Sequence, residues 1–470
     1  MQALLDKAFA RPVVAKIRDF VSQNDYQAFL IGGYVRDLFL YRDSKDIDIV
    51  VEKNGIQFAN ELAKYLGVKK VAVFKTYGTA QLVYKGMEIE VVNARKESYT
   101  TESRNPAVEQ GTLQDDQNRR DFTINALAIK IGNKPELIDP FNGLGHLDQQ
   151  IIKTPLDPDL TFSDDPLRMM RAIRFACQLG FRIEEKTFEA IRKNAHRLEI
   201  ISQERITTEF NKIMESPVPS IGFYLLEEAG LLELFFPEFI ELKGTERING
   251  LSHKDNFHHT LEVLDNVARL SDKLWLRYAA VFHDIAKPAT KRFEPKIGFT
   301  FHGHEDKGSR MVKPIFRRMK LPLGDPMKYV SKMVLLHLRP IALTKEIITD
   351  SAIRRLIVDA EDDIEDLLLL CKCDITSKNE KKKVKYLNNL EEVRDKIQKV
   401  IAADEIRNWQ PLVTGNHLME WISFEHPRQI GELKSALREA ILEGELSNDF
   451  EVSKQFVLDL ASRNGLTLKT

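Results

Sequence analysis

The sequence predicts an α+β protein in which a small mixed β-sheet comes first and helices make up the remainder. The chain of 470 residues exceeds the roughly 250 to 300 residues that one hydrophobic core serves, so we expect several domains. Strand and helix signals alternate in the first part, whereas from about residue 160 onward apolar residues recur at helical spacing with few strand signals. Pro155 and Pro158 mark this change.

The first part gives strand and helix signals in a regular order. QAFLIGG (27–33) predicts a strand that runs into a glycine pair, VRDLFLYR (35–42) a helix and DIDIVVE (46–52) a second strand. IQFANELAKYLG (56–67) predicts another helix, and a strand-rich stretch follows from Val71 to Arg95.

The composition argues against a membrane protein and leaves the partner open. With 43% hydrophobic and 30% charged residues, the chain has no apolar run near the ~20 residues that span a bilayer. Residues 1–20 carry charges throughout, unlike a secretory signal, so we expect a cytoplasmic location. Cys177, Cys371 and Cys373 are too few for a disulfide framework. The net charge of −1 neither favours nor excludes a nucleic acid, which would bind local basic clusters.

Two acids one residue apart, Asp46 and Asp48, interrupt the second strand. Because successive side chains of a strand alternate between faces, both acids share one face, about 6.6 Å apart along the strand. Carboxylates at this spacing suit one or two Mg²⁺ ions of the kind used in phosphoryl chemistry. A later strand offers a third acid, Glu88 or Glu90. The alternative is a solvent-facing edge strand without a metal.

The glycine pair before the acids predicts a phosphate site. Gly32 and Gly33 lie between a strand and a helix that begins near Tyr34. Glycine lets the backbone approach a phosphate closely, and the N-terminus of a helix presents free N–H groups. Arg36 in the first turn of that helix has a guanidinium suited to a triphosphate.

Two further stretches carry charged residues at helical spacing. In DDPLRMMRAIRF, Asp165 and Pro166 are typical of a helix start, and Arg168, Arg171 and Arg174 form a stripe that predicts either surface ion pairs or nucleotide binding. The opposite face carries Leu167, Met170, Ile173 and Cys177. In RRDFTINALAI, we expect Asp121 and Asn125 at positions i and i+4 of a helix, contacting ribose hydroxyls or forming structural ion pairs.

Five motifs in order resemble the class II tRNA nucleotidyltransferases, the CCA-adding enzymes, which share the polymerase-β-like superfamily with bacterial poly(A) polymerases. The motifs are GGYVRDLFLYRDSKDIDIV (32–50), RRDFTINALAI (119–129), DPFNGLGHLDQQIIKT (139–154), DDPLRMMRAIRFACQLGF (164–181) and ERITTEF (204–210). The resemblance implies Mg²⁺ bound by Asp46 and Asp48, with Glu90 as the third catalytic acid. Its implied nucleotide-binding residues are Gly32, Gly33, Arg36, Asp37, Arg120, Asp121, Asn125, Asp165, Arg168, Arg171 and Arg174.

The resemblance further implies that the protein selects the base without a nucleic-acid template. Asp165 and Arg168 take the positions that contact the Watson–Crick edge, and Arg120 holds phosphate. Asp164 stands where the family has glutamate, which shortens its reach. Residues 96–116 resemble a flexible loop associated with adding the terminal A, and their presence favours complete CCA addition.

A separate set of histidines and aspartates resembles the HD-domain phosphohydrolases. His283 and Asp284 form the adjacent pair, and His259 and Asp374 would complete a mononuclear metal site. His304 and His337 would extend it to a second ion, with His302 as a further candidate. Mixed imidazole and carboxylate ligands suit Mn, Fe, Ni or Zn. The alternatives are hydrolysis of phosphate esters and an inherited structural site without turnover.

Together these observations predict a nucleotidyltransferase head (1–155), an elongated helical neck that selects the nucleotide (156–245), an HD domain (246–378) and a helical, RNA-supporting tail (379–470). The expected reaction adds CMP and AMP from CTP and ATP to the 3′ end of tRNA, with no obligate protein partner. Two rivals remain: a poly(A) polymerase, and an HD-type phosphohydrolase with a nucleotide-binding head.

Overall fold

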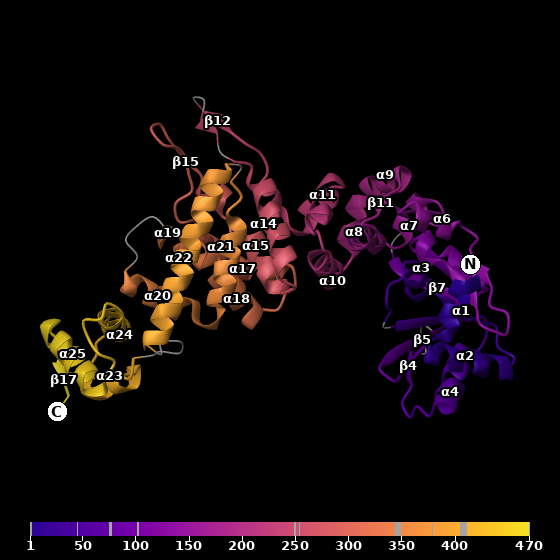
Figure 1. The fold of residues 1–470 in the computed structure, drawn as a ribbon, viewed down its shortest axis with the longest axis horizontal. Helices are drawn as coiled ribbons and strands as arrows, with labels where there is room; N and C mark the ends of the chain where they lie inside the picture. Colours follow the sequence, from indigo (N-terminus) through magenta and orange to yellow (C-terminus); the bar gives the residue numbers. More distant parts are fainter. Residues whose placement is uncertain are drawn as a thin grey trace. The chain divides into compact units, whose positions relative to one another are not determined.

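The computed structural model describes residues 2–44, 46–74, 78–100, 103–248, 251–252, 254–343, 349–377, 379–404 and 411–469. They belong to two compact units, Met1–Ile240 and Glu241–Thr470 (Figure 1). The predicted fold class is confirmed, because the first unit contains a mixed sheet and helices dominate the rest of the chain. The bounds of the four predicted domains stay a prediction. Among the described residues, no helix is both long and apolar enough to cross a membrane.

The sheet of the first unit has seven strands in the order β3-β4-β5-β2-β1-β8-β9. β2 and β5 run parallel, and every other neighbouring pair is antiparallel. The strands are β1 (Ala28–Ile31), β2 (Asp46–Val51), β3 (Ala72–Phe74), β4 (Thr79–Tyr84), β5 (Met87–Asn93), β8 (Ala128–Lys130) and β9 (Leu137–Ile138).

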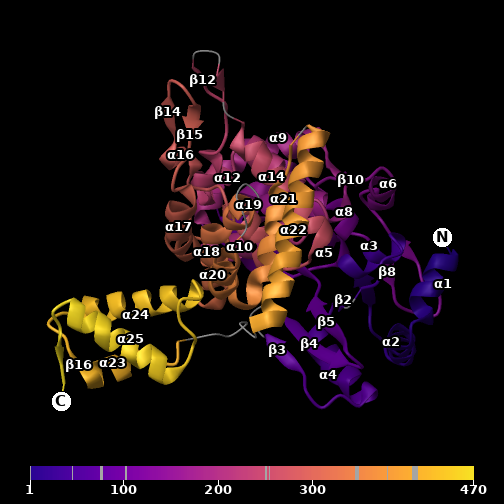
Figure 2. The same cartoon turned by 60° about the vertical axis from the view of Figure 1, so that its left-hand side comes forward.

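Helix α4 (Gly55–Leu66) follows β2 and covers one face of this sheet. Its buried side chains Phe58, Ala59 and Leu62 form the apolar stripe that its periodicity predicts. Beside it lie β4 and β5 (Figure 2). The helices that precede α4 are α1 (Gln2–Ala10), α2 (Pro12–Gln23) and α3 (Gly33–Phe39). Because α4 packs on the face that holds Ile47 and Ile49, the acids of β2 lie on the opposite face.

Two predictions for the segment after β5 were wrong. Strands β6 (Arg95–Thr100) and β7 (Ser103–Gln110) pair antiparallel, where a loop was expected. Their polar sequence lacks the alternation of apolar residues by which strands are recognised. Helix α5 (Leu113–Asn118) follows with a capping box at Thr112. Asp121 lies outside any helix, and only a 3-10 turn at Thr123–Asn125 separates it from β8.

The later part of the first unit, where the neck is predicted, consists of short helices around an aromatic core. They are α7 (Pro158–Asp164), α8 (Leu167–Leu179), α9 (Glu185–Asn194), α10 (Gln203–Met214), α11 (Ser220–Glu228), α12 (Leu232–Phe235) and α13 (Pro237–Ile240), with α6 (Gly143–Asp148) before them. A two-stranded parallel ribbon pairs β10 (Ile151–Ile152) with β11 (Arg182–Ile183). In α8 the predicted apolar face is confirmed, since all four of its residues are buried.

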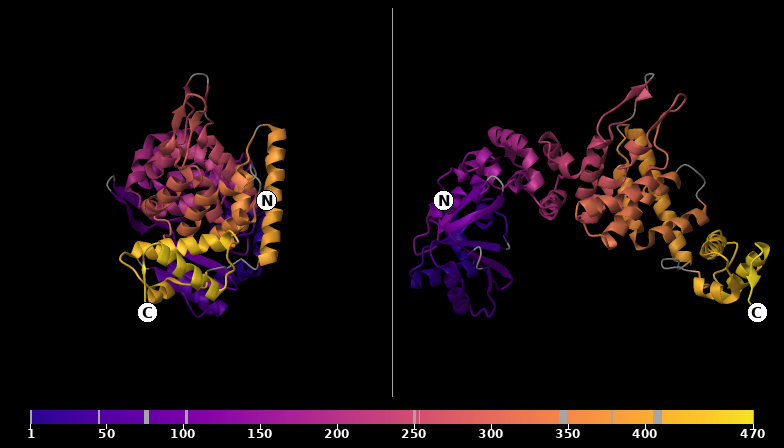
Figure 3. Two further views of the ribbon diagram at one scale, coloured as in Figure 1. Left: turned by 90° about the vertical axis from the view of Figure 1, so that its left-hand side faces the viewer. Right: turned by 180° about the vertical axis from the view of Figure 1, so that it is seen from behind.

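Among its described residues, the second unit is helical apart from short antiparallel ribbons. Its helices are α14 (Asn256–Leu270), α15 (Leu274–Phe282), α16 (Lys287–Thr290), α17 (His304–Arg318), α18 (Asp325–Leu336), α19 (Arg339–Leu343), α20 (Asp350–Ala360), α21 (Ile364–Asp374), α22 (Glu380–Asp404), α23 (Gly415–Trp421), α24 (Pro427–Leu442) and α25 (Phe450–Arg463). The ribbons are β12–β13 (Arg247–Ile248 with Leu251–Ser252), β14–β15 (Arg292–Glu294 with Gly298–Thr300) and β16–β17 (Ile422–Ser423 with Thr467–Leu468). The last three helices lie next to one another, drawn in yellow in Figure 3. They share an apolar core of their own.

Candidate active sites

The three predicted acids of the head lie on neighbouring strands. In the parallel register of β2 with β5, Asp46 is opposite Glu88 and Asp48 is opposite Glu90. Strands in a sheet are about 4.8 Å apart, so the acids form one compact group. Asp46 and Glu90 are exposed, and Asp48 is partly buried. Both Glu88 and Glu90 face the same side, and Gln81 donates a hydrogen bond to Glu88.

Asp48 has the environment of a cation ligand. Burial raises the pKa of its carboxyl to about 6, Arg120 opposes this rise, and Glu90 and Asp46 add to it. A divalent cation would relieve the repulsion among these acids, and carboxylate oxygens are the ligands that Mg²⁺ prefers. The donor set therefore fits Mg²⁺.

The turn between β1 and α3 passes directly over Asp48. Gly32 has φ +74°, and a Cβ atom there would lie 2.8 Å from Asp48 Oδ2 and 2.9 Å from Arg120 Nη1. Gly33 lacks both constraints, because the nearest atom to its Cβ position is Arg36 Nη2 at 3.7 Å. Only the first glycine of the pair is therefore required by the backbone and by the space around it.

Cationic side chains flank this turn, each held by a polar partner. Arg36 donates to Asn125 Oδ1 over 2.9 Å and to both carboxylate oxygens of Asp37 over 2.8 and 3.0 Å. Arg120 donates to Asp116 over 3.1 Å, and Arg119 donates to the same carboxylate over 3.0 Å. Asp116 is fully buried and was not predicted. The only signal for Asp116 in the sequence was its spacing from Arg119 and Arg120, which follow it by three and four residues.

Each of the three arginines of the α8 stripe has its own polar partners. Arg168 is buried and donates to the main-chain carbonyls of Arg119 over 2.8 Å and Thr161 over 3.4 Å. Arg171 donates through Nε to Asp121 over 2.8 Å, and Arg174 forms an ion pair of 2.7 Å with Glu209 of α10. The stripe is thus largely an internal framework rather than a set of surface ion pairs.

Asp121 connects this framework to the head. Its buried carboxylate accepts from Phe122 N and Asn125 Nδ2 as well as from Arg171. Burial alone would raise its pKa, but Arg171 and Asn125 hold the pKa of Asp121 at about 2. The structure therefore gives Asp121 the ion-paired arrangement that the sequence left as one of two alternatives.

A cavity of about 370 Å³ lies between residues 119–121, which follow α5, and helices α8 and α10. The predicted residues Arg120, Asp121, Asp165, Arg168 and Arg171 line it. Asp165 accepts from Leu167 N over 3.2 Å and lies 3.9 Å from Arg205. Sequence reasoning missed the other lining residues, which are Arg119, Leu167, Arg205, Thr208 and Glu209. Arg205, Thr208 and Glu209 belong to the ERITTEF motif, so that motif was the available signal.

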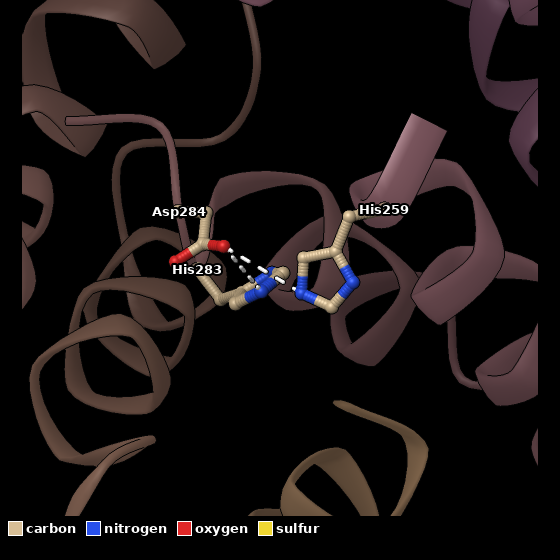
Figure 4. A group of neighbouring side chains, drawn as sticks. All are labelled: His259, His283 and Asp284. Atoms are coloured by element: carbon tan, nitrogen blue, oxygen red, sulfur yellow. Dashed lines mark ion pairs between the residues drawn. The ribbon is translucent and has the colours of Figure 1, made fainter. Parts of the chain in front are cut away.

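A second cluster of predicted residues is buried in the helices of the second unit. Two ligand groups share Asp284. One contains His259 and His283 (Figure 4), and the other contains His304 and His337. Asp374 lies 2.9 Å from His259 Nε2 and 3.5 Å from His283 Nε2. His302 is exposed and belongs to neither group.

Hydrogen bonds orient three of these histidines toward the centre of the cluster. His283, His304 and His337 direct Nδ1 to the carbonyls of Ala280, Phe301 and Val334 over 2.7, 2.8 and 2.7 Å. A carbonyl only accepts, so Nδ1 carries the proton and Nε2 faces the carboxylates. The Nε2 atoms of His283 and His304 are buried and make no hydrogen bond within the described part of the chain. This donor set fits a transition-metal ion.

The ionisable groups of this cluster shift one another's pKa values. Burial opposes a proton on His283, but Asp284 and Asp374 raise its pKa to about 10. Burial and the charge of His283 lower the pKa of His337 to about 4. The two carboxyls have pKa values below their usual range because the histidines, and Lys287 beside Asp284, stabilise their charged forms against burial. A metal ion would compete with the proton on His283.

Known families match three regions of the chain. Residues 28–153 match the poly A polymerase head domain, residues 180–242 the probable RNA and SrmB-binding site of polymerase A, and residues 256–379 the HD domain. A solved structure of the CCA-adding enzyme of Bacillus stearothermophilus in complex with CTP has the same fold, with a TM-score of 0.64 at 23% identity, covering 97% of this chain and 98% of that chain.

Three relatives differ in the nucleotides that their names specify. The chain is 32% identical to the A-adding tRNA nucleotidyltransferase of Deinococcus radiodurans over 72% of this chain and 77% of that protein. It is 42% identical to the CCA-adding enzyme of Geobacillus sp. over 46% of this chain and 52% of that enzyme. It is 28% identical to the CC-adding tRNA nucleotidyltransferase of Thermus thermophilus over 94% of this chain and 95% of that protein.

The head and its relatives make the chain an enzyme of the nucleotidyltransferase class that also carries an HD domain. Nucleotidyltransferase and HD domains generally use divalent metals, in agreement with both donor sets above. The relative from Deinococcus is matched over more than two thirds of its length at 32% identity. The chain belongs to the family of tRNA nucleotidyltransferases and poly(A) polymerases, and the predicted resemblance is confirmed.

Proposed function

We propose that the protein adds CMP and AMP from CTP and ATP to the 3′ end of tRNA, without a template and with release of pyrophosphate. The register of β2 with β5 carries this proposal, because Asp48 is opposite Glu90 directly below the Gly32 turn. The relatives named above for A, CC and CCA addition support tRNA as the substrate. A cytoplasmic location is part of this proposal.

In the proposed reaction, the 3′-oxygen of the tRNA forms a bond to the α-phosphorus, and the bond from that phosphorus to the β-phosphate oxygen breaks. Asp46, Asp48 and Glu90 would hold Mg²⁺, which when bound polarises the α-phosphate and lowers the pKa of the attacking hydroxyl. Arg36 and Arg120 bind the triphosphate and stabilise the charge that moves onto pyrophosphate. Catalysis is then mainly positioning and charge stabilisation.

Base selection is assigned to Asp165 and Arg168 at the cavity. Arg168 has five N–H groups and directs two of them to main-chain carbonyls, which fixes the guanidinium plane. A carboxylate accepts from the exocyclic amine that cytosine and adenine share. Uracil and guanine present a carbonyl at that position, so both are rejected.

The β6–β7 hairpin supports complete CCA addition over CC or A addition alone. It occupies the segment that resembles the loop associated with the terminal A. The rival functions differ in product: a poly(A) polymerase adds runs of A to any RNA 3′ end.

Purified protein with tRNA lacking its 3′ CCA tests the proposal. Given CTP and ATP, we expect two C and one A per tRNA, and no addition from UTP, by sizing and sequencing the products. Given CTP alone, addition should stop after two C. Products that end at CC with both nucleotides present would mean CC addition alone. Addition of A only to tRNA that already ends in CC would mean A addition alone. Runs of A on arbitrary RNA would mean a poly(A) polymerase.

For the second site we propose metal-dependent hydrolysis of phosphate esters. The supporting observation is the pair of ligand groups that share Asp284, with ring nitrogens directed inward. Ions of the Mn, Fe, Ni or Zn class suit these ligands. Hydrolysis of p-nitrophenyl phosphate and of cyclic nucleotides, assayed with each ion, should occur in the protein and vanish in Asp284→Asn. If hydrolysis survives Asp284→Asn, or if no ion supports hydrolysis, the cluster is a structural site without turnover.

A further inference from the structure

Helix α22, labelled in the second unit in Figure 1, has a buried face that does not reach its start. Its buried side chains recur at helical spacing and form one stripe, made up of Leu390, Val393, Ile397 and Val400. Tyr386, four residues before Leu390 on the same stripe, is 38% exposed. Residues 380–386 therefore lie outside the hydrophobic core, so packing does not explain their sequence.

This first part of α22 carries a cluster of lysines. Three are exposed, namely Lys381, Lys382 and Lys385, and Lys383 is half-buried. Glu380 is the one acid of the segment 380–386, so four positive charges gather within five residues of a chain whose net charge is −1. Because residues four apart lie one above the other on a helix, the three exposed ammonium groups share one side of α22.

Further along the same helix, the cations are paired with carboxylates. Arg394 lies 3.1 Å from Glu365. Lys396 lies 3.3 Å from Asp350. Within the described part of the chain, none of the four lysines at the start of α22 forms an ion pair. Helix stability does not account for these lysines either, because cations near the N-terminus of a helix are unfavourable. Their charge is therefore available to a partner.

We propose that the exposed lysines at the start of α22 bind the phosphate backbone of RNA. The inference rests on the proposed function, which brings a polyanion to the protein, and it adds a place on the second unit where this polyanion is held. Ammonium groups on flexible stems contact phosphates as point charges and do not read bases, so the surface binds RNA of any sequence alike. Each contact releases counterions, which makes the binding dependent on salt.

Binding of tRNA to the full chain tests the proposal, measured by fluorescence anisotropy between about 50 and 300 mM KCl. The variant combines Lys381→Gln, Lys382→Gln and Lys385→Gln, since glutamine has nearly the same helix propensity as lysine. We expect the affinity near 100 mM salt to fall at least about tenfold. The slope of the logarithm of affinity against the logarithm of salt concentration should fall by about three, one for each phosphate contact.

A second triple variant is the matched control, with the same change of charge at exposed lysines elsewhere in the second unit. It combines Lys296→Gln, Lys313→Gln and Lys399→Gln, and it should keep the affinity and the slope of the unchanged chain. Steady-state addition gives a further readout. The α22 variant should raise KM for tRNA, whereas kcat and KM for CTP should stay within about twofold, because the lysines hold the RNA equally before and during the reaction.

The outcomes separate this inference from the proposed function. An unaltered salt slope in the α22 variant, or an equal loss of affinity in the control variant, would overturn the binding surface and leave nucleotide addition by the head in place. A chain that binds no tRNA at any salt concentration would overturn the proposed substrate and this surface together. The helical circular dichroism signal confirms that each variant is folded.

Discussion

The head site and the HD cluster both place acids close together, but in opposite surroundings. In the head, Asp46 and Glu90 are exposed on an open sheet, and every predicted ligand atom is an oxygen. In the HD domain, His283 and Asp284 are 1% exposed and His337 is 2% exposed, with imidazole nitrogens in the majority. Open oxygen sites suit Mg²⁺ and its water shell, whereas enclosed imidazole sites suit transition metals. The two sites should therefore respond independently to changes of metal and of sequence.

The two sites also balance charge differently. The HD cluster compensates its carboxylates internally, through its histidines and Lys287. In the head, Arg36 of α3 and Arg120 after α5 oppose the rise in the pKa of Asp48, and each is itself held by a carboxylate, Asp37 or Asp116. An internally neutral cluster needs only its ion, while the head keeps positive charge in position for a substrate that brings several negative charges.

The strongest test of this independence is Asp48→Ala. Loss of a cation ligand should lower nucleotide addition by roughly 10³-fold, which corresponds to about 4 kcal/mol of transition-state stabilisation. Co²⁺ binding by the HD cluster should not change. Glu88→Ala is the matched control, because Glu88 faces the same side of β5 one pair away and should cost less than about tenfold. Equal losses in Glu88→Ala and Glu90→Ala would contradict the choice of Glu90 as the third acid.

The next largest effect is expected at the turn over Asp48. Gly32→Ala would force Cβ against Asp48 and Arg120 at a φ of +74°, and we expect roughly a 10²-fold loss of addition. Gly33→Ala, whose Cβ position is clear to 3.7 Å, should retain most activity. Single-turnover rates on tRNA separate the two variants. Similar rates for both would mean that the turn adapts and does not position the acids.

The Asp121–Arg171 pair should make the head sensitive to acid. The folded pKa of Asp121 is about 2, below the unfolded value near 3.9, so its stabilising contribution is present above about pH 4 and is lost as the pH falls toward 2. The contribution is about 2 kcal/mol. Trp275, Trp409 and Trp421 all lie in the second unit, so fluorescence does not report on the head.

Amide exchange of peptides covering α8 is the suitable measurement for this pair. In Asp121→Asn, exchange at pH 7 should be faster than in the unchanged chain, and the difference should shrink at low pH. Exchange in α15 of the HD domain serves as the internal control. If the difference in exchange rate between the two chains stays constant down to about pH 2.5, the ionised carboxylate of Asp121 is not what stabilises the head.

The smallest effect is expected in base choice. Arg168→Ala should lower discrimination against UTP by about tenfold, since a good contact to a base edge contributes about 1 to 3 kcal/mol. Competition between CTP and UTP on one tRNA measures it, and Arg182→Ala, exposed on β11, is the control. Unchanged discrimination in Arg168→Ala would remove Arg168 from base selection and leave it as part of the framework.

Sequence reasoning was most successful where the signal is local. The alternation of Asp46 and Asp48 with Ile47 and Ile49 fixes the face of the acids within one strand. It failed where partners come from distant elements: Glu209 reaches Arg174 from another helix, and Thr376, beyond α21, reaches His259 of α14. The polar β6–β7 hairpin was missed because it lacks the apolar alternation that reveals other strands.

Both the burial of the core and the placement of the catalytic acids depend on the parallel register of β2 and β5. Along β5, Glu88 and Glu90 are exposed while Ile89 and Val91 are fully buried. A slip of one residue would turn both glutamates toward the apolar core and bring Ile89 to the face of Asp48. Such a chain would be unstable as well as inactive, so proteolysis would remove it before it could bind tRNA unproductively. Burial of Ile89 and Val91 in the hydrophobic core therefore fixes the register in which the glutamates of β5 face the aspartates of β2.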